Sequence, residues 1–201
     1  GPQSTTLMDP ELHIGIDLYE QIAVSSIAYM NKEKLVDHTC TTKLPSGKCV
    51  RTLTPEADLA TIIAHSLIKE QMYPLSEYYT FIHYLKKMNI HSFIQIVKWN
   101  NLTIAARTHA TLTALLHKVA HGTIPKKLHQ ILEHVDVEAL ETKLFLQSNF
   151  KTPYKYHVFT MARSLLEIMK ERKSRNSISM QILHMSNPSF TKDFIRKLIE
   201  H

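Results

Sequence analysis

The feature that most constrains the fold of this chain is a change of hydrophobic period at Thr54. Residues 12–18 alternate between apolar and polar side chains, which is typical of a half-buried strand. After Thr54 the apolar residues recur every three or four positions, as they do in amphipathic helices. We therefore expect an α+β fold in which a small N-terminal mixed β-sheet packs on a larger, predominantly α-helical bundle. The expected division places the β-rich region at 1–53 and the helical bundle at 54–201.

The N-terminal region is predicted to contain three extended parts. The first is the alternating stretch, and the second is residues 21–30, which are rich in β-branched side chains. Residues 39–44 and 48–53 flank the turn sequence LPSG and are predicted to pair as a hairpin. Cys40 and Cys49 lie on opposite sides of this turn, so a short disulfide is geometrically possible. Two thiols in a chain without a recognisable secretion signal are more often reduced.

The helical region opens with several start signals. Thr54 is a good N-cap, and Pro55 suits the first helical position. Glu56 and Asp58 complement the positive end of the helix dipole, and Pro74 is expected to end this helix. The chain has only four glycines, which argues against a large antiparallel β protein. Further helices are predicted at 92–99, 103–121, 126–134, 137–148, 154–172, 177–185 and 189–200.

The net charge bears on the class of partner. The chain has 24 Lys and Arg residues against 18 Asp and Glu residues, so its formal charge is +6. This excess favours a nucleotide or nucleic acid as partner, although many proteins are as basic without binding an anion. A protein partner stays open, as does the oligomeric state. No apolar run approaches the roughly 18 residues of a membrane span. We therefore expect no membrane partner and a cytoplasmic protein.

The most specific string in the chain lies at residues 54–70 and reads TPEADLATIIAHSLIKE. Together with LSEYY at 75–79, it resembles a pattern in the polymerase-β-like nucleotidyltransferase superfamily. The resemblance is strongest for small prokaryotic members and the related abortive-infection antitoxins. In those proteins a Ser/Thr-Pro-Glu-Asp cap opens a helix after the last strand of the catalytic sheet. A His and a Lys-Glu pair follow three turns later, and an acidic residue opens the next helix.

The resemblance implies roles for five residues. The string Glu-Leu-His that begins at Glu11 resembles the Asp-Leu-His strand signature that supplies the family's third metal-binding carboxylate. Glu11 or Asp17 is therefore the expected catalytic acid, and the other interpretation of each is a solvent-facing acid on a strand. His65 and Lys69 share a helical face, which the resemblance directs toward substrate phosphate together with Glu70. The alternative is that His65 is a core histidine and the other two are surface charges.

The resemblance is incomplete where the family performs its chemistry. Nucleotidyl transfer uses two Mg²⁺ ions held by carboxylates at one edge of a sheet. Two of these carboxylates come from an Asp-x-Asp strand, which follows a Gly-Ser turn that grips phosphate. This chain contains neither motif, and its comparable turn, PSGK at 45–48, precedes a predicted strand. We therefore expect a nucleotidyltransferase-like protein. This chain is expected to be catalytically incomplete by itself. Mg²⁺ is expected only if the missing carboxylates are supplied.

The alternative function is a non-catalytic helical module that binds a protein or a nucleic acid through its basic face. The densest basic cluster, near a predicted helix end, consists of Lys170, Arg172, Lys173 and Arg175. Contact with nucleic-acid phosphate is one interpretation of this cluster, and the lysine pairs at 86–87 and 126–127 support it. The other interpretation is that these cations complement a helix dipole.

Two further patterns concern a metal site and ribonuclease activity. His117 and His121 have the i, i+4 spacing that can chelate zinc, but Lys118 stands where the metalloprotease motif needs Glu. One such pair is expected by chance among 13 histidines, so we expect no metal there. Arg196 and His201 match the Arg-x4-His pattern of a helical ribonuclease family. A ribonuclease-like toxin component is therefore the third hypothesis.

Overall fold

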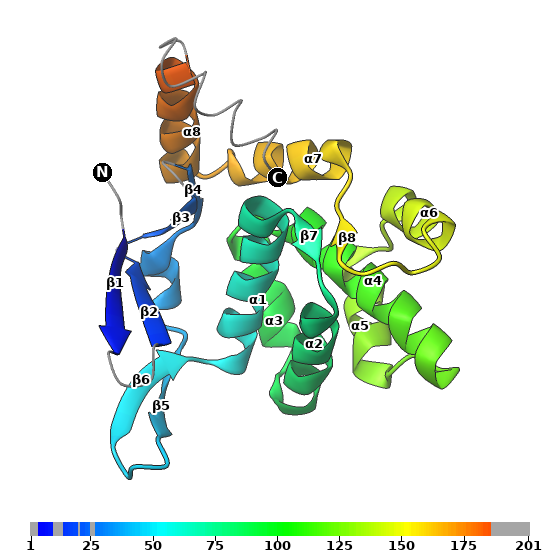
Figure 1. Cartoon of the computed structure of the whole chain (residues 1–201), viewed down its shortest axis with the longest axis horizontal. Coiled ribbons are helices and arrows are strands. Elements are labelled where there is room, and N and C mark those ends of the chain that lie inside the picture. The colour runs from blue at the N-terminus through cyan, green and yellow to red at the C-terminus, as the bar shows by residue number, and fades with distance from the viewer. Residues whose placement is uncertain (1–3, 10–13, 20, 25–26, 186–201) are drawn as a thin grey trace.

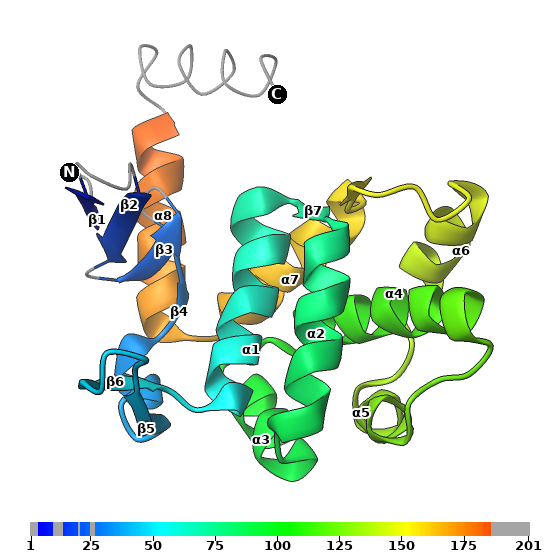
Figure 2. The same ribbon diagram turned by 60° about the horizontal axis from the view of Figure 1, so that its bottom comes forward.

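The computed structural model describes residues 4–9, 14–19, 21–24 and 27–185. Most strands and helix α8 lie on one side of the molecule, and the other helices form a bundle beside them (Figures 1 and 2). The α-helices of the described residues are α1 (Pro55–His65), α2 (Leu75–Lys87), α3 (Ile90–Trp99), α4 (Thr103–His121), α5 (Lys126–Val135), α6 (Ala139–Gln147), α7 (Val158–Ile168) and α8 (Arg172–Met185). This architecture confirms the expected α+β fold. None of the described helices is both long and apolar enough to cross a membrane.

The strands of the described residues form separate antiparallel pairs and do not join into one sheet. The pairs are β1 (Ser4–Asp9) with β2 (Ile14–Tyr19), β3 (Ile22–Val24) with β4 (Ile27–Met30), β5 (Thr39–Lys43) with β6 (Cys49–Leu53), and β7 (Met72–Tyr73) with β8 (Tyr154–Lys155). The expected mixed sheet is therefore corrected to a set of two-stranded pairs. The first three pairs form because short strands joined by short connections pair with their neighbour in the chain.

The predicted hairpin on either side of residues 44–48 is confirmed as the β5–β6 pair. Its register places Cys40 opposite Thr52 and Cys49 opposite Lys43. The two cysteines therefore do not face each other across the pair. Both are exposed free thiols, so the disulfide that the sequence allows is not formed.

Helix α1 lies in the interior of the bundle and contacts α2, α3 and α4. Its predicted start is confirmed, because Thr54 occupies the N-cap position and Pro55 the first helical position. Leu59 and Ile63 are fully buried, and three alanines complete the buried face. Small side chains on this face allow neighbouring helices to approach closely. The C-terminal end of α1 is thereby fixed against the rest of the bundle.

The contact between β4 and α8 joins the N-terminal strands to the C-terminal helices (Figure 2). The backbone N–H of Ala28 in β4 donates to the Ser177 hydroxyl oxygen in α8 at 3.1 Å. Two ion pairs of 2.6 Å link the 3₁₀ helix η1 (Lys32–Leu35) to the start of α8, namely Lys34–Glu171 and Glu33–Lys173. The division at residue 53 stays a prediction, and these contacts cross it.

Buried tyrosines make the fold sensitive to high pH. Burial raises the pKa of Tyr73 and Tyr156, and burial next to the Asp58 carboxylate raises the pKa of Tyr84 to about 12. In the unfolded chain these hydroxyls titrate near pH ~10. Between these two pKa values the unfolded chain loses protons that the folded chain keeps. The stabilisation is therefore fully present below pH ~10 and is lost as the pH rises toward the folded pKa values.

We expect the urea midpoint of unfolding to fall between pH ~8 and pH ~11.5. In the variant Tyr84→Phe this fall should be smaller, because one of the responsible hydroxyls is gone. Tyr79→Phe, which changes an exposed side chain, is the matched control and should keep most of the pH dependence, because its hydroxyl adds only to the raised pKa of Tyr78. An equal fall of the urea midpoint in Tyr84→Phe and in the wild-type protein would contradict the assignment of this pH dependence to Tyr84.

Candidate functional site

Three side chains form a hydrogen-bonded row where α1 meets the N-terminal strands. The Tyr29 hydroxyl, on β4, lies 2.8 Å from Nδ1 of His65, the last residue of α1. Nε2 of His65 lies 3.1 Å from Oε1 of Glu70. Nζ of Lys69 lies 3.8 Å from the same carboxylate oxygen. We call these four residues the His65 cluster. It contains the three substrate-site residues predicted from the sequence and adds Tyr29.

A π-helical turn, η2 (Ser66–Glu70), explains how Glu70 reaches His65. Hydrogen bonds in such a turn run between residues five positions apart, so side chains with that spacing come close together. Ser66 is fully buried at the start of the turn, and its hydroxyl donates to the carbonyl oxygen of Met72 at 2.8 Å. The turn is therefore anchored to the segment that follows it, and the cluster is built on a fixed backbone.

The hydrogen-bond directions in the row follow from the chemistry of its groups. A carboxylate can only accept, so Nε2 of His65 donates to Glu70. When the imidazole is neutral, its Nδ1 is then the acceptor of a hydrogen bond from the Tyr29 hydroxyl. Tyr29 is 3% exposed, whereas the side chain of Glu70 is 48% exposed. The row thus runs from the interior to the surface and holds the imidazole in one orientation and one tautomer.

Two donors of the cluster face a single oxygen atom. His65 Nε2 and Lys69 Nζ both lie within 4 Å of Oε1 of Glu70, at 3.1 and 3.8 Å. The side chains of His65 and Lys69 are 35% and 32% exposed, so a dissolved anion can reach them. If the exposed Glu70 side chain moved into solvent, an oxygen of a phosphate group would meet the same donors. The cluster therefore suits an oxyanion.

Of the two expected catalytic acids, the structure describes only the backbone of Asp17. Glu11 lies outside the described residues. Asp17 lies on β2, where its backbone pairs with that of Thr6, and its side chain is not described. In the described ranges, no group of three or more His, Cys, Asp and Glu side chains is placed to hold a metal ion. His117 and His121, whose ring centres lie 4.5 Å apart, also have no third ligand in this part of the chain.

The four cations predicted to contact nucleic acid have different surroundings. Lys173 forms the ion pair with Glu33, and its ammonium group holds the pKa of that carboxyl below its usual range. Lys170 lines a separate pocket of about 240 Å³ beside α7. Arg172 and Arg175 are exposed on the first turn of α8. The four predicted cations are thus divided between the junction with η1 and the solvent-facing surface.

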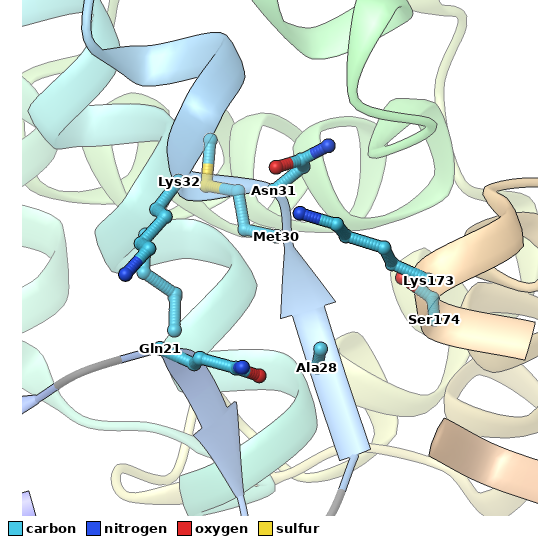
Figure 3. Close-up of a pocket in the computed structure, with 8 residues that line it drawn as sticks. Gln21, Ala28, Met30, Asn31, Lys32, Lys173 and Ser174 are labelled. Carbon is cyan, nitrogen blue, oxygen red and sulfur yellow. The ribbon is translucent and has the colours of Figure 1, made fainter. Parts of the chain in front are cut away.

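A small pocket lies between β4 and α8 (Figure 3). Met30, Lys32 and Lys173 line it, and Lys173 extends from α8 toward Asn31 in the close-up view. Its volume of about 40 Å³ leaves room for little more than water. We therefore assign no organic ligand to this pocket.

Comparisons of the chain with protein-family models, with curated proteins and with solved structures found no match. The nucleotidyltransferase resemblance therefore stays a hypothesis that rests on the motifs alone. The function has to be inferred from the geometry of the side chains.

The sequence reasoning missed Tyr29. Its contact with His65 joins residues 36 positions apart, and it depends on how β4 packs against α1. The stretch that contains Tyr29 was predicted as extended, which is the only signal that the sequence offers. No spacing rule pairs a tyrosine on a strand with a histidine on a later helix. The three residues that were found lie within a single stretch, 65–70, where helical spacing applies.

Proposed function

We propose that this chain is a nucleotidyltransferase-like protein that binds the phosphate groups of a nucleotide at the His65 cluster. The observation that carries this proposal is the convergence of His65 Nε2 and Lys69 Nζ on one oxygen of Glu70. A phosphate oxygen would take the place of that carboxylate oxygen. The resemblance of residues 54–70 to nucleotidyltransferases supports the same class of ligand.

Each residue of the cluster has its own part in this binding. Lys69 supplies a compact positive charge, and His65 donates a hydrogen bond from Nε2. Tyr29 keeps the imidazole in the required orientation after Glu70 has left. Glu70 is the internal anion that the ligand displaces. Because its side chain is about half exposed, its contact with Lys69 is a surface ion pair of small net energy.

Binding and positioning of the nucleotide are what the described residues can perform. Glu11 and Asp17 remain the proposed catalytic acids, and Mg²⁺ would act there only if further carboxylates are supplied. A cytoplasmic location remains a prediction that goes with this function.

Binding of fluorescently labelled ribonucleoside triphosphates is expected to depend on the cluster. Lys69→Ala and His65→Ala should each raise the Kd about tenfold, because each removes a charge-assisted contact worth roughly 1.5 kcal/mol. Glu70→Gln should lower the Kd, because it removes the competing negative charge. Equilibrium titration followed by fluorescence polarisation measures these changes.

The matched control is Lys98→Ala, which removes an exposed lysine from α3 and should leave the Kd unchanged. Inorganic triphosphate in a competition titration tests whether the phosphate chain is the part that is bound. If the wild-type chain binds none of the labelled ribonucleoside triphosphates, or if the cluster variants bind them as well as the wild-type chain does, the proposal is wrong.

A non-catalytic nucleic-acid-binding module is the second candidate. The observation that favours it is the exposure of Arg172 and Arg175 on one end of α8. The ion pair of Lys173 with Glu33 argues against this second candidate, because the charge of this lysine is already paired with a carboxylate. The ribonuclease hypothesis rests on Arg196 and His201, which lie outside the described residues.

A further inference from the structure

A pocket of about 370 Å³ lies at the end of the helical bundle where α2, α4 and α5 meet. Its lining consists of Ile82, Leu85, Lys86, His117, Pro125, Lys126 and Lys127. Leu85 is 4% exposed, so the floor of the pocket belongs to the hydrophobic core. The volume falls at the lower end of the roughly 300–1,000 Å³ that is usual for ligand sites. It is large enough for one or two aliphatic side chains.

The rim of this pocket is strongly cationic. Lys86 comes from the last turn of α2, while Lys126 and Lys127 are the first two residues of α5. None of the lining residues is acidic. Nζ of Lys127 donates to the backbone carbonyl oxygen of Met88 at 3.1 Å, which places the ammonium group without neutralising it. Three of the four lysines in the pairs at 86–87 and 126–127, namely Lys86, Lys126 and Lys127, thus meet at one site.

The position of the lysines on α5 adds to this charge. A helix N-terminus carries a partial positive charge and is stabilised by anions. The first turn of α5 contains no acidic residue, and its N-cap, Pro125, provides no capping side chain. Two lysines at this place are electrostatically unfavourable in the isolated chain. A bound group of negative charge would relieve that repulsion.

The lining distinguishes between classes of anionic partner. Single-stranded nucleic acid is held by aromatic side chains on which the bases stack. Here His117 carries the only aromatic ring among the lining residues, and its Nδ1 is hydrogen-bonded to the Thr123 carbonyl oxygen at 3.0 Å. An aliphatic floor with separate lysines around it is complementary to an aliphatic side chain flanked by carboxylates. These features favour a peptide over a nucleotide.

We propose that this pocket is a docking site for an acidic peptide segment of a partner protein. One aliphatic side chain of the segment lies on Leu85, and neighbouring Asp or Glu residues pair with Lys86, Lys126 and Lys127. This surface is separate from the His65 cluster and does not depend on nucleotide binding.

Selection of randomised 12-residue peptides displayed on phage against the full chain tests this inference. The enriched peptides should carry an aliphatic residue between acidic residues. Synthetic copies of the enriched peptides should bind with a Kd that rises at least tenfold in the double variant Lys86→Glu/Lys126→Glu. The matched control Lys98→Glu/Lys143→Glu changes the net charge equally on exposed positions elsewhere and should bind as the wild-type chain does.

Circular dichroism of both double variants shows whether they keep the wild-type fold, and Ile82→Ser tests the apolar floor without changing any charge. Failure to enrich acidic peptides, or equal binding to the charge-reversed variant, would overturn the inference. Tight binding of a single-stranded oligonucleotide that needs Lys86 and Lys126 would assign the pocket to nucleic acid instead. His65→Ala should leave peptide binding intact, so this inference and the proposed function fail independently.

Discussion

Replacing Phe81 by alanine is expected to lower the free energy of unfolding by about 3–5 kcal/mol. The side chain is fully buried in α2 at the centre of the bundle. Its ring centre lies 6.4 Å from that of Phe93 on α3, in an edge-to-face arrangement, and 5.8 Å from that of His109 on α4, nearly parallel. Removing the ring takes away contacts with two neighbouring helices at once. Because the surrounding helices can collapse only partly, a cavity remains.

Urea unfolding followed by circular dichroism measures this loss. The control is His83→Ala, which removes an exposed ring two positions along the same helix and should change the free energy by less than about 0.5 kcal/mol. A loss for Phe81→Ala of no more than about 1 kcal/mol would mean that α2 does not pack as described.

The helix best predicted from the sequence is α4, whose bounds of Thr103–His121 agree with the structure. A long stretch of helical periodicity predicts the helix, and both ends carry local signals. Gly122 ends the helix in a left-handed conformation with φ 75°, which glycine adopts without strain. Asn101, with φ 56°, marks the break before it. These signals lie in the chain itself, so no tertiary contact is needed to read them.

Helix α7 was predicted at 154–172, but the structure begins it at Val158 and ends it at Ile168. The residues before it belong to β8, in which Tyr154 pairs with Tyr73 of β7. Tyrosine is compatible with both a helix and a strand, and the choice depends on a partner from a distant part of the chain. A local pattern therefore could not place this boundary.

The candidate sites also combine features that local sequence patterns predict with features that depend on tertiary contacts. The neighbourhood of His65, Lys69 and Glu70 was predicted because these residues lie within two turns of one helix. The sequence suggested that His65 faces Lys69, whereas the π-helical turn places Glu70 against its ring. Such a turn has no local sequence signature. The sequence could not predict the lysine-rimmed pocket either, since Lys86 and Lys126 come together only when the bundle forms.

Replacing Glu141 by alanine is expected to lower the free energy of unfolding by about 3 kcal/mol or more. This carboxylate on α6 is fully buried. It accepts one hydrogen bond from the Tyr154 hydroxyl and another, of 2.9 Å, from the backbone N–H of His157. Alanine would leave the buried Tyr154 hydroxyl and the partly buried His157 N–H without this acceptor. Each unsatisfied donor costs roughly 1–3 kcal/mol, and the lost packing adds to this.

Glu141→Gln separates the hydrogen bonds from the packing, because its amide oxygen can still accept from one of the two donors. Its loss of stability in urea unfolding should lie between that of Glu141→Ala and that of Glu133→Ala, an exposed carboxylate on α5. The effect should also reach η2, since the Tyr156 hydroxyl, two residues beyond Tyr154, lies 3.2 Å from that of Ser66. Hydrogen exchange of the η2 amides should therefore be faster in Glu141→Ala than in Glu133→Ala. Equal exchange in the two variants would mean that the turn carrying the His65 cluster does not depend on the contact with Tyr156.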